Sequence, residues 1–172
     1  MRARIVRDLY LAQWHEVWFF PAHGGVHGWQ GTLDILFVGL NPSTGRFPSV
    51  ADRLLYRHLA RNGFGRAHLT DLIKERAAGP AVSAIERDVE RMRRYRHYLL
   101  AEIEIVRPRL IVAMGDRAYD ILTKCWLLSD ARLRQIPHYA ARFPTAATRR
   151  RFGAVMARIR REYGRMARQD QP

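Results

Sequence analysis

Polar side chains that can take part in chemistry lie in or directly after three apolar runs of the sequence. Asn41 follows one run, Asp71 lies in another and His138 follows a third. An amide and a carboxyl can hold a water molecule or the polar edge of a ligand, and an imidazole can donate a hydrogen bond to developing negative charge. If the three runs are neighbouring strands, these residues form a candidate hydrolytic or binding site.

Asn41 belongs to the motif Gly39-Leu40-Asn41-Pro42-Ser43, where glycine opens a turn and proline stiffens it. The short amide at the end of a buried strand can fix a water molecule by hydrogen bonds. The same five residues are also typical of an ordinary Asn-Pro turn. His138 has a matching alternative as a structural histidine at the end of a strand.

Apolar runs alternate with helical patterns along the chain. We expect strands over residues 33–40, 68–73, 110–114 and 132–136, and helices over residues 51–61, 84–106 and 149–166, with one more helix capped by Asp116. Such alternation predicts right-handed crossovers and a three-layer α/β/α fold around a mostly parallel, four-stranded sheet. Ligands of such sheets bind outside the carboxyl ends of the strands, where Asn41 and His138 lie.

The chain of 172 residues fits a single domain, with core motifs at about 33–142 and a basic C-terminal helix at about 149–166. Its apolar runs are too short to cross a membrane, and the N-terminus lacks a signal-peptide pattern. We therefore expect a cytoplasmic protein. Cys125 is the only cysteine, which excludes an internal disulfide and a multi-thiolate metal site, and we expect it to pack in or near the core.

Positive charge dominates the composition. Thirty Lys and Arg against sixteen Asp and Glu give a formal net charge of +14, nearly all of it from arginine, whose planar fork suits phosphate. Residues 142–168 alone hold nine arginines and one acid, Glu162. A polyanionic partner is the leading interpretation. The alternatives are a general compositional preference for arginine and a merely solvated helix face.

Four ordered motifs resemble those of the uracil-DNA glycosylase superfamily. Residues 39–42 (Gly-Leu-Asn-Pro) are similar to the first motif of its mismatch-specific and single-strand-selective branches, and residues 70–74 (Thr-Asp-Leu-Ile-Lys) to an element of its bacterial and archaeal branches. Residues 107–115 resemble the third strand of the superfamily, and residues 137–140 (Pro-His-Tyr-Ala) its last motif.

The resemblance implies a monofunctional DNA glycosylase. It would hydrolyse the N-glycosidic bond of uracil or another deaminated base flipped out of DNA, as a monomer without metal or cofactor, on nucleoid DNA that contains a damaged or mismatched base. Asn41 would orient the attacking water, and His138 would donate a hydrogen bond to the leaving base. Phe47 would stack on the base, or it anchors its loop.

The remaining site residues follow from the same resemblance. Those expected to shape the base pocket are Gly39, Leu40, Pro42, Phe47, Thr70 and Asp71. Those expected to contact DNA are Ser43, Tyr139, Arg142, Arg149, Arg150 and Arg151.

Two departures from the family pattern concern specificity. Asp71 stands where several branches have an Asn that reads uracil, and an ionised Asp can only accept hydrogen bonds. Protonation of a buried Asp71 would restore a donor. Tyr139 and Ala140 replace the usual Pro-Ser, so the serine's phosphate contact is lost, and Tyr139 or Arg142 could fill the space of the extruded nucleotide.

The sequence also allows other interpretations of the function. One is an inactive protein of the same fold that only recognises a base in DNA. Another is a general nucleic-acid-binding protein in which Asn41 and His138 are structural. A metal held by His23 and His27 has the least support, since no matching ligands accompany this pair.

Overall fold

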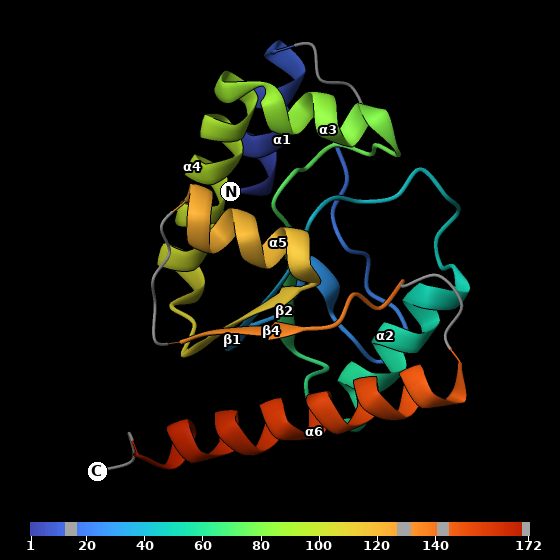
Figure 1. The fold of residues 1–172 in the computed structure, drawn as a ribbon. Helices are drawn as coiled ribbons and strands as arrows, with labels where there is room; N and C mark the ends of the chain where they lie inside the picture. Colours follow the sequence, from blue (N-terminus) through green and yellow to red (C-terminus); the bar gives the residue numbers. More distant parts are fainter. Residues whose placement is uncertain (13–16, 127–131, 141–144, 170–172) are drawn as a thin grey trace.

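The computed structural model describes residues 1–12, 17–126, 132–140 and 145–169 (Figure 1). Its centre is a four-stranded sheet in which every neighbouring pair of strands is parallel, in the order β2-β1-β3-β4. The strands are β1 (Leu33–Gly39), β2 (Ala67–Asp71), β3 (Leu110–Met114) and β4 (Leu133–Ile136).

Helices connect and flank these strands. They are α1 (Arg2–Leu11), α2 (Val50–Arg61), α3 (Pro80–Arg87), α4 (Val89–Val106), α5 (Asp116–Asp120) and α6 (Ala146–Gln169). Two short turns, a 3₁₀ turn at Gly28–Gln30 and a π turn at Ile121–Cys125, complete the regular structure. Within the described ranges, no helix combines the length and apolar character needed to cross a bilayer.

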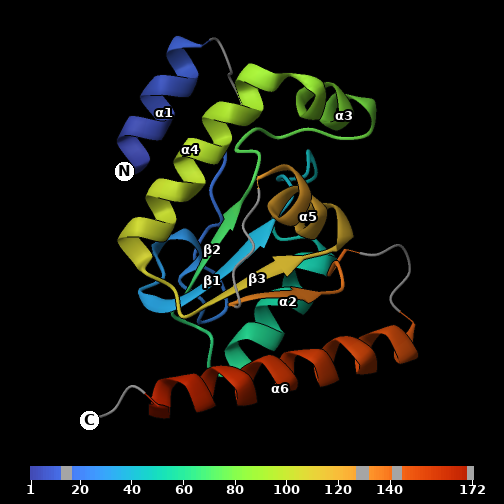
Figure 2. The same ribbon diagram turned by 60° about the vertical axis from the view of Figure 1, so that its left-hand side comes forward.

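The helices form one layer on each face of the sheet. Helices α1, α3, α4 and α5 cover one face, and α2 and α6 cover the other (Figures 1 and 2). A hydrophobic core lies on each face of the sheet, and alternate residues of β1 pack into the two cores. Leu36 and Val38 face the first helix layer, and Ile35 and Phe37 face the second. Because both faces are covered, residues 35–38 of β1 are all apolar and buried, as is typical of parallel sheets. The predicted three-layer α/β/α fold is confirmed.

The helix predicted over residues 84–106 is wrong as a single helix. Asp88 divides it into α3 and α4: its backbone is extended, and its carboxylate accepts a hydrogen bond of 3.0 Å from the backbone N–H of Arg91. An Asp at an N-cap stabilises a new helix start, so the chain turns here although the apolar spacing continues.

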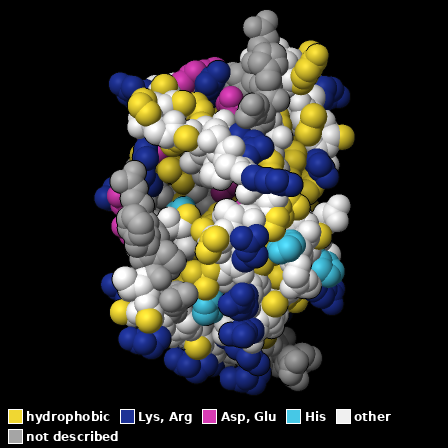
Figure 3. All heavy atoms as spheres, turned by 90° about the vertical axis from the view of Figure 1, so that its right-hand side faces the viewer, with side chains coloured by type: hydrophobic (Ala, Val, Ile, Leu, Met, Phe, Trp, Pro, Cys, Tyr) yellow, Lys and Arg dark blue, Asp and Glu magenta, His cyan; other side chains and the backbone are white. Residues whose placement is uncertain are grey.

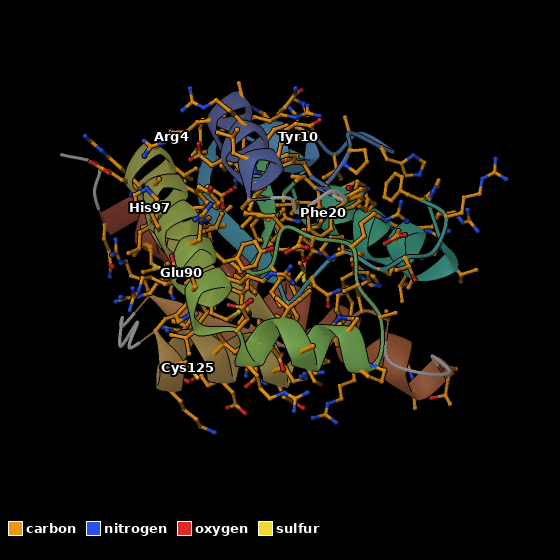
Figure 4. All side chains as sticks on the ribbon, turned by 90° about the horizontal axis from the view of Figure 1, so that it is seen from above. Arg4, Tyr10, Phe20, Glu90, His97 and Cys125 are labelled. Carbon is orange, nitrogen blue, oxygen red and sulfur yellow. The ribbon has the colours of Figure 1, made fainter. Side chains whose placement is uncertain are left out.

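Two local predictions beside α5 are also wrong. Asp116 is the first residue of α5 rather than its cap; its carboxylate accepts a 2.6 Å hydrogen bond from Gln135 Nε2. Cys125, expected in or near the core, is exposed at the outer edge of the molecule (Figure 4). The π turn that ends at Cys125 places its neighbour Trp126 in the core instead.

Candidate active site

The carboxyl ends of the strands bring the predicted site residues to one edge of the sheet. Gly39 at the end of β1 pairs with Asp71 at the end of β2. At the other side of this edge, a Cβ atom added to Gly115 would lie 3.0 Å from His138 Cβ, so the chain after β3 contacts the chain after β4. Asn41 lies just beyond Gly39.

Asn41 is held in one orientation by two backbone carbonyls. Its Nδ2 donates to the oxygen of Pro42 at 2.9 Å and to the oxygen of Ala77 at 2.8 Å. Both partners only accept, so the amide cannot be flipped without losing both bonds. The Oδ1 atom has no partner in the described part of the chain. The half-buried side chain therefore presents an open acceptor.

The segment after β2 fixes the loop that carries Asn41. The backbone N–H groups of Leu72 and Ile73 donate to the oxygens of Gly39 and Leu40, each at 2.9 Å. Arg76 Nε then donates to the oxygen of Ser43 at 2.9 Å, and a second Arg76 nitrogen donates to Gly45.

Sequence reasoning missed Arg76 and Ala77, because their contacts depend on how two loops meet and no motif marks them. Ser43, predicted to contact DNA, has an exposed side chain, and its carbonyl is the group that Arg76 holds.

Asp71 is a buried carboxyl in contact with Gly39. Its residue is 4% exposed, and a Cβ atom at position 39 would collide with its Oδ1, so a larger residue there would force the carboxyl to shift. Burial raises the pKa of Asp71 to about 8, and the neighbouring Lys74 ammonium only partly opposes this effect.

Thr70 and Lys74 belong to a buried ionic network rather than to an open pocket. Lys74 Nζ lies 2.9 Å from Glu102 Oε1 on α4, and it also donates to the oxygen of Asp71 at 2.8 Å and to Thr70 Oγ1. Trp29 Nε1 donates to the same Glu102 oxygen at 3.1 Å. Thr70, predicted to shape the base pocket, thus supports the end of β2 from within the core.

His138 presents a neutral donor. Its Nδ1 accepts a 3.1 Å hydrogen bond from the backbone N–H of Ala140, so the proton of the neutral ring is on Nε2. Although the residue is exposed as a whole, protein atoms around the ring desolvate it and lower the pKa of His138. The imidazole is therefore neutral at physiological pH, with Nε2–H available to donate.

Tyr139 stacks on His138 and packs, partly buried, against the core between the sheet and helices α2 and α6. The two ring centroids are 5.0 Å apart and the planes are 12° from parallel. Beside Tyr139 remains a cavity of about 20 Å³, lined by Trp18, Pro42, Ser43, Gly45, Phe47, Asp52, Arg76 and Tyr139. Such a volume holds about one water molecule. Tyr139 has to move before a base can enter here.

Phe47 is both a loop anchor and part of this cavity wall. Its ring centroid lies 5.9 Å from that of Trp18, 5.7 Å from His23 and 5.6 Å from Tyr56. His23, considered as a metal ligand, thus packs in an aromatic cluster. Among the described residues, no group of three or more His, Cys, Asp or Glu is arranged to hold a metal ion.

Two of the arginines predicted to contact DNA can be placed, and both lie near the start of α6. Arg150 and Arg151 are exposed on that helix. Arg142 and the side chain of Arg149 lie outside the described residues. Lys and Arg side chains gather over the lower part of the face that Figure 3 presents, where α2 and the beginning of α6 lie (Figures 1 and 3).

The sequence was compared with models of known protein families. The model of the Uracil DNA glycosylase superfamily matches residues 28–160. The chain belongs to the uracil DNA glycosylase superfamily. This match takes in all four strands and the loops that carry Asn41 and His138, and it confirms the resemblance read from the motifs. A search of curated proteins found no match to the chain. Membership in the superfamily indicates DNA glycosylase activity in general and DNA as the substrate.

Proposed function

We propose that this superfamily member is a monofunctional DNA glycosylase that hydrolyses the N-glycosidic bond of uracil or another deaminated base extruded from DNA. The observation that carries the proposal is the fixed orientation of Asn41. With both amide protons held by the carbonyls of Pro42 and Ala77, its Oδ1 is open at the sheet edge where ligands of parallel sheets bind. This acceptor suits a water molecule.

In this mechanism Asn41 Oδ1 accepts a hydrogen bond from the water and aims its oxygen at the anomeric carbon. A C–O bond forms there while the C–N bond breaks, and the electron pair of the broken bond leaves with the base. The water gives its proton to solvent, and the departing base anion takes one from solvent. His138 Nε2–H donates to the base oxygen on which negative charge develops. One such preorganised donor contributes about 3 kcal/mol to the barrier reduction.

The distribution of unpaired arginines supports a phosphate-bearing partner. On α4, Arg91 lies 3.4 Å from Asp88 and Arg93 lies 3.5 Å from Glu90. Exposed arginines of α6 make no ion pair or hydrogen bond within the described residues: Arg158, Arg160, Arg161, Arg165 and Arg168. A general preference for arginine does not account for this difference between two helices of one chain. We infer that the α6 side faces DNA phosphates, on nucleoid DNA, with the protein acting as a monomer.

One observation favours a second candidate, a protein that recognises DNA without hydrolysis. Tyr139 leaves only about 20 Å³ beside the loop of Asn41, and the cavity of about 900 Å³ at His138 is not lined by Asn41, so no space for a base joins the two residues in this conformation. An active enzyme requires Tyr139 to swing out when a base enters.

Release of free base distinguishes the two candidates. The substrates are oligonucleotides that carry uracil, thymine opposite guanine, hypoxanthine or xanthine. Release from at least one supports the glycosylase. Tight, salt-sensitive binding of all of them without any release supports the binding protein.

A further inference from the structure

A cavity of about 360 Å³ lies beside β2, the strand at one edge of the sheet, and its volume is typical of a small-molecule site. The rings of Trp18, Phe19 and Trp29 line it, and each of these residues is only half-buried. Single exposed apolar residues are common on protein surfaces, whereas several aromatic rings around one hollow mark a binding site. The proposed hydrolysis does not use this cavity, which we call the aromatic cavity.

Backbone hydrogen bonds near both ends of β2 hold the segment that carries these rings. Beyond the carboxyl end of the strand, the N–H of Trp18 donates to the oxygen of Lys74 at 2.9 Å. Before the start of the strand, the N–H of His27 donates to the oxygen of Gly65 at 2.8 Å. The walls of the cavity are therefore in place before a ligand arrives, which lowers the entropy that binding costs.

The rings of the aromatic cavity are tilted against each other. The centroids of Phe19 and Trp29 are 4.7 Å apart with an angle of 60° between the planes, and those of Trp18 and Phe20 are 5.1 Å apart with an angle of 66°. Neither pair is stacked face to face, so ring faces remain for a flat ligand. The guanidinium of Arg2, which also lines the cavity, lies 5.2 Å from the centroid of Phe19 and adds positive charge to this wall.

Trp18 connects the aromatic cavity with the candidate active site. It lines this cavity and also the small one beside Tyr139, and its ring centroid lies 5.9 Å from that of Phe47 in the loop after Asn41. A DNA strand with one nucleotide at the Asn41 loop therefore reaches the aromatic cavity by passing Trp18.

We propose that the aromatic cavity binds an unpaired base of the DNA strand, a neighbour of the nucleotide at the Asn41 loop, by stacking. A nucleobase fits the flat ring faces, and the charge of Arg2 suits the phosphate that comes with it. Gln30 and His27, which are exposed and line the cavity, can form hydrogen bonds with the edge of the base.

This site favours single-stranded DNA over a duplex. In a duplex the faces of each base are covered by its neighbours, so only an unpaired base can enter the cavity. The position of this base next to the extruded one rests on the proposed function, whereas its stacking in the cavity does not require hydrolysis. The inference is therefore tested by affinity alone.

The experiment measures dissociation constants by fluorescence anisotropy on three labelled ligands of about 12 nucleotides. They are a single strand of deoxycytidine, which holds no deaminated base, its duplex with deoxyguanosine, and a strand of abasic sugars with the same phosphates. Phe19→Leu removes a ring and keeps an apolar side chain, and Phe19→Tyr keeps the ring. Tyr10→Leu is the matched control, since Tyr10 is an exposed ring on α1 that does not line the cavity (Figure 4).

We expect Phe19→Leu to bind the cytidine strand about tenfold more weakly than wild type, because a stacking surface is lost. Its affinities for the duplex and for the abasic strand stay at the wild-type values. Phe19→Tyr and Tyr10→Leu bind all three ligands as wild type does. Circular dichroism checks that each variant is folded.

A loss in Phe19→Leu that is confined to the strand with bases supports the inference. Equal losses on all three ligands, or no loss in the folded variant, overturn it. Equal affinities of wild type for the cytidine strand and the abasic strand also overturn it, and this comparison needs no variant, so a misfolded Phe19→Leu still leaves a decisive result. Failure to release any base refutes the proposed glycosylase and leaves these affinities unchanged.

Discussion

The side-chain amide of Asn41 is bound to the carbonyl oxygen of Ala77 at 2.8 Å, 36 residues further along the chain. This hydrogen bond joins the loop after β1 to the segment after β2, and with the bond to Pro42 it decides which amide atom faces outward. The orientation of the Asn41 amide is thus fixed by tertiary contacts and not by the motif alone.

Exchange of Asn41 for Asp tests this orientation. The carboxylate has almost the same shape, but it offers oxygen to the carbonyls of Pro42 and Ala77, which repel it. We expect single-turnover base release to fall about 100-fold or more, in the range of positioned catalytic groups. Thermal unfolding measured in parallel controls for the fold. Full activity in a folded Asn41→Asp protein would contradict the assigned role.

The buried carboxyl of Asp71 makes stability depend on pH in a defined direction. Its pKa is about 8 in the folded state and about 3.8 when unfolded, so between these values the folded protein binds more protons and stability falls as pH rises. Asp71→Asn removes this dependence. Its unfolding free energy should exceed that of wild type by an amount that grows by up to about 1.4 kcal/mol per pH unit from pH 4 to 8. Urea unfolding at pH 5, 6.5 and 8 measures it. A constant difference contradicts the prediction.

The buried pair of Lys74 and Glu102 supports the end of β2. Both side chains are almost fully buried, so removal of one partner leaves an unpaired charge in the core. We expect Lys74→Met to lower the unfolding free energy by about 3–5 kcal/mol. The double variant with Glu102→Leu, which removes both charges, should recover much of that loss. Denaturant unfolding compares the two, and a double variant that is less stable than Lys74→Met would refute a pairing role.

The unpaired arginines of α6 are expected to extend the DNA contact away from the site. The helix has 24 residues and spans about 36 Å. Changing four of its exposed arginines to Gln should lower the salt dependence of DNA binding, with the slope of log affinity against log salt falling by about 0.9 for each lost phosphate contact. The four are Arg160, Arg161, Arg165 and Arg168.

A matched control removes the same charge from the opposite layer. It changes exposed arginines of α1, α3 and α4 to Gln, namely Arg4, Arg87, Arg93 and Arg96. We expect this variant to keep nearly the wild-type slope. Equal slopes in the two variants would mean that net charge alone, and not the α6 surface, governs binding.

The sequence predicts the sheet better than the helices. The two central strands are buried on both faces, so residues 35–38 of β1 and residues 110–114 of β3 form continuous apolar runs that end at glycine. The sequence pattern does not reveal the break between α3 and α4 at Asp88, because the apolar residues keep helical spacing across it. Helix α1 has only Ile5 and Leu9 buried, which is too weak a pattern to predict it.

The candidate site is predictable only in part. Asn41 and His138 follow strands of a parallel sheet, so their common edge can be expected from topology. The contacts of Arg76 with Ser43 and of Asn41 with Ala77 depend on how two loops pack, which no spacing encodes. The packing of Tyr139 against the core cannot be predicted from the sequence either, because an aromatic ring in a loop can point toward the core or toward solvent.

The most direct test of the glycosylase is release of free base under single-turnover conditions by wild type and His138→Ala. The substrates are matched oligonucleotides with one deaminated base or with its normal counterpart. We predict release from the deaminated strand only, reduced about 100-fold in His138→Ala because the donor to the leaving base is lost. No release of any base by the folded wild-type protein, or equal release by His138→Ala, would contradict the account.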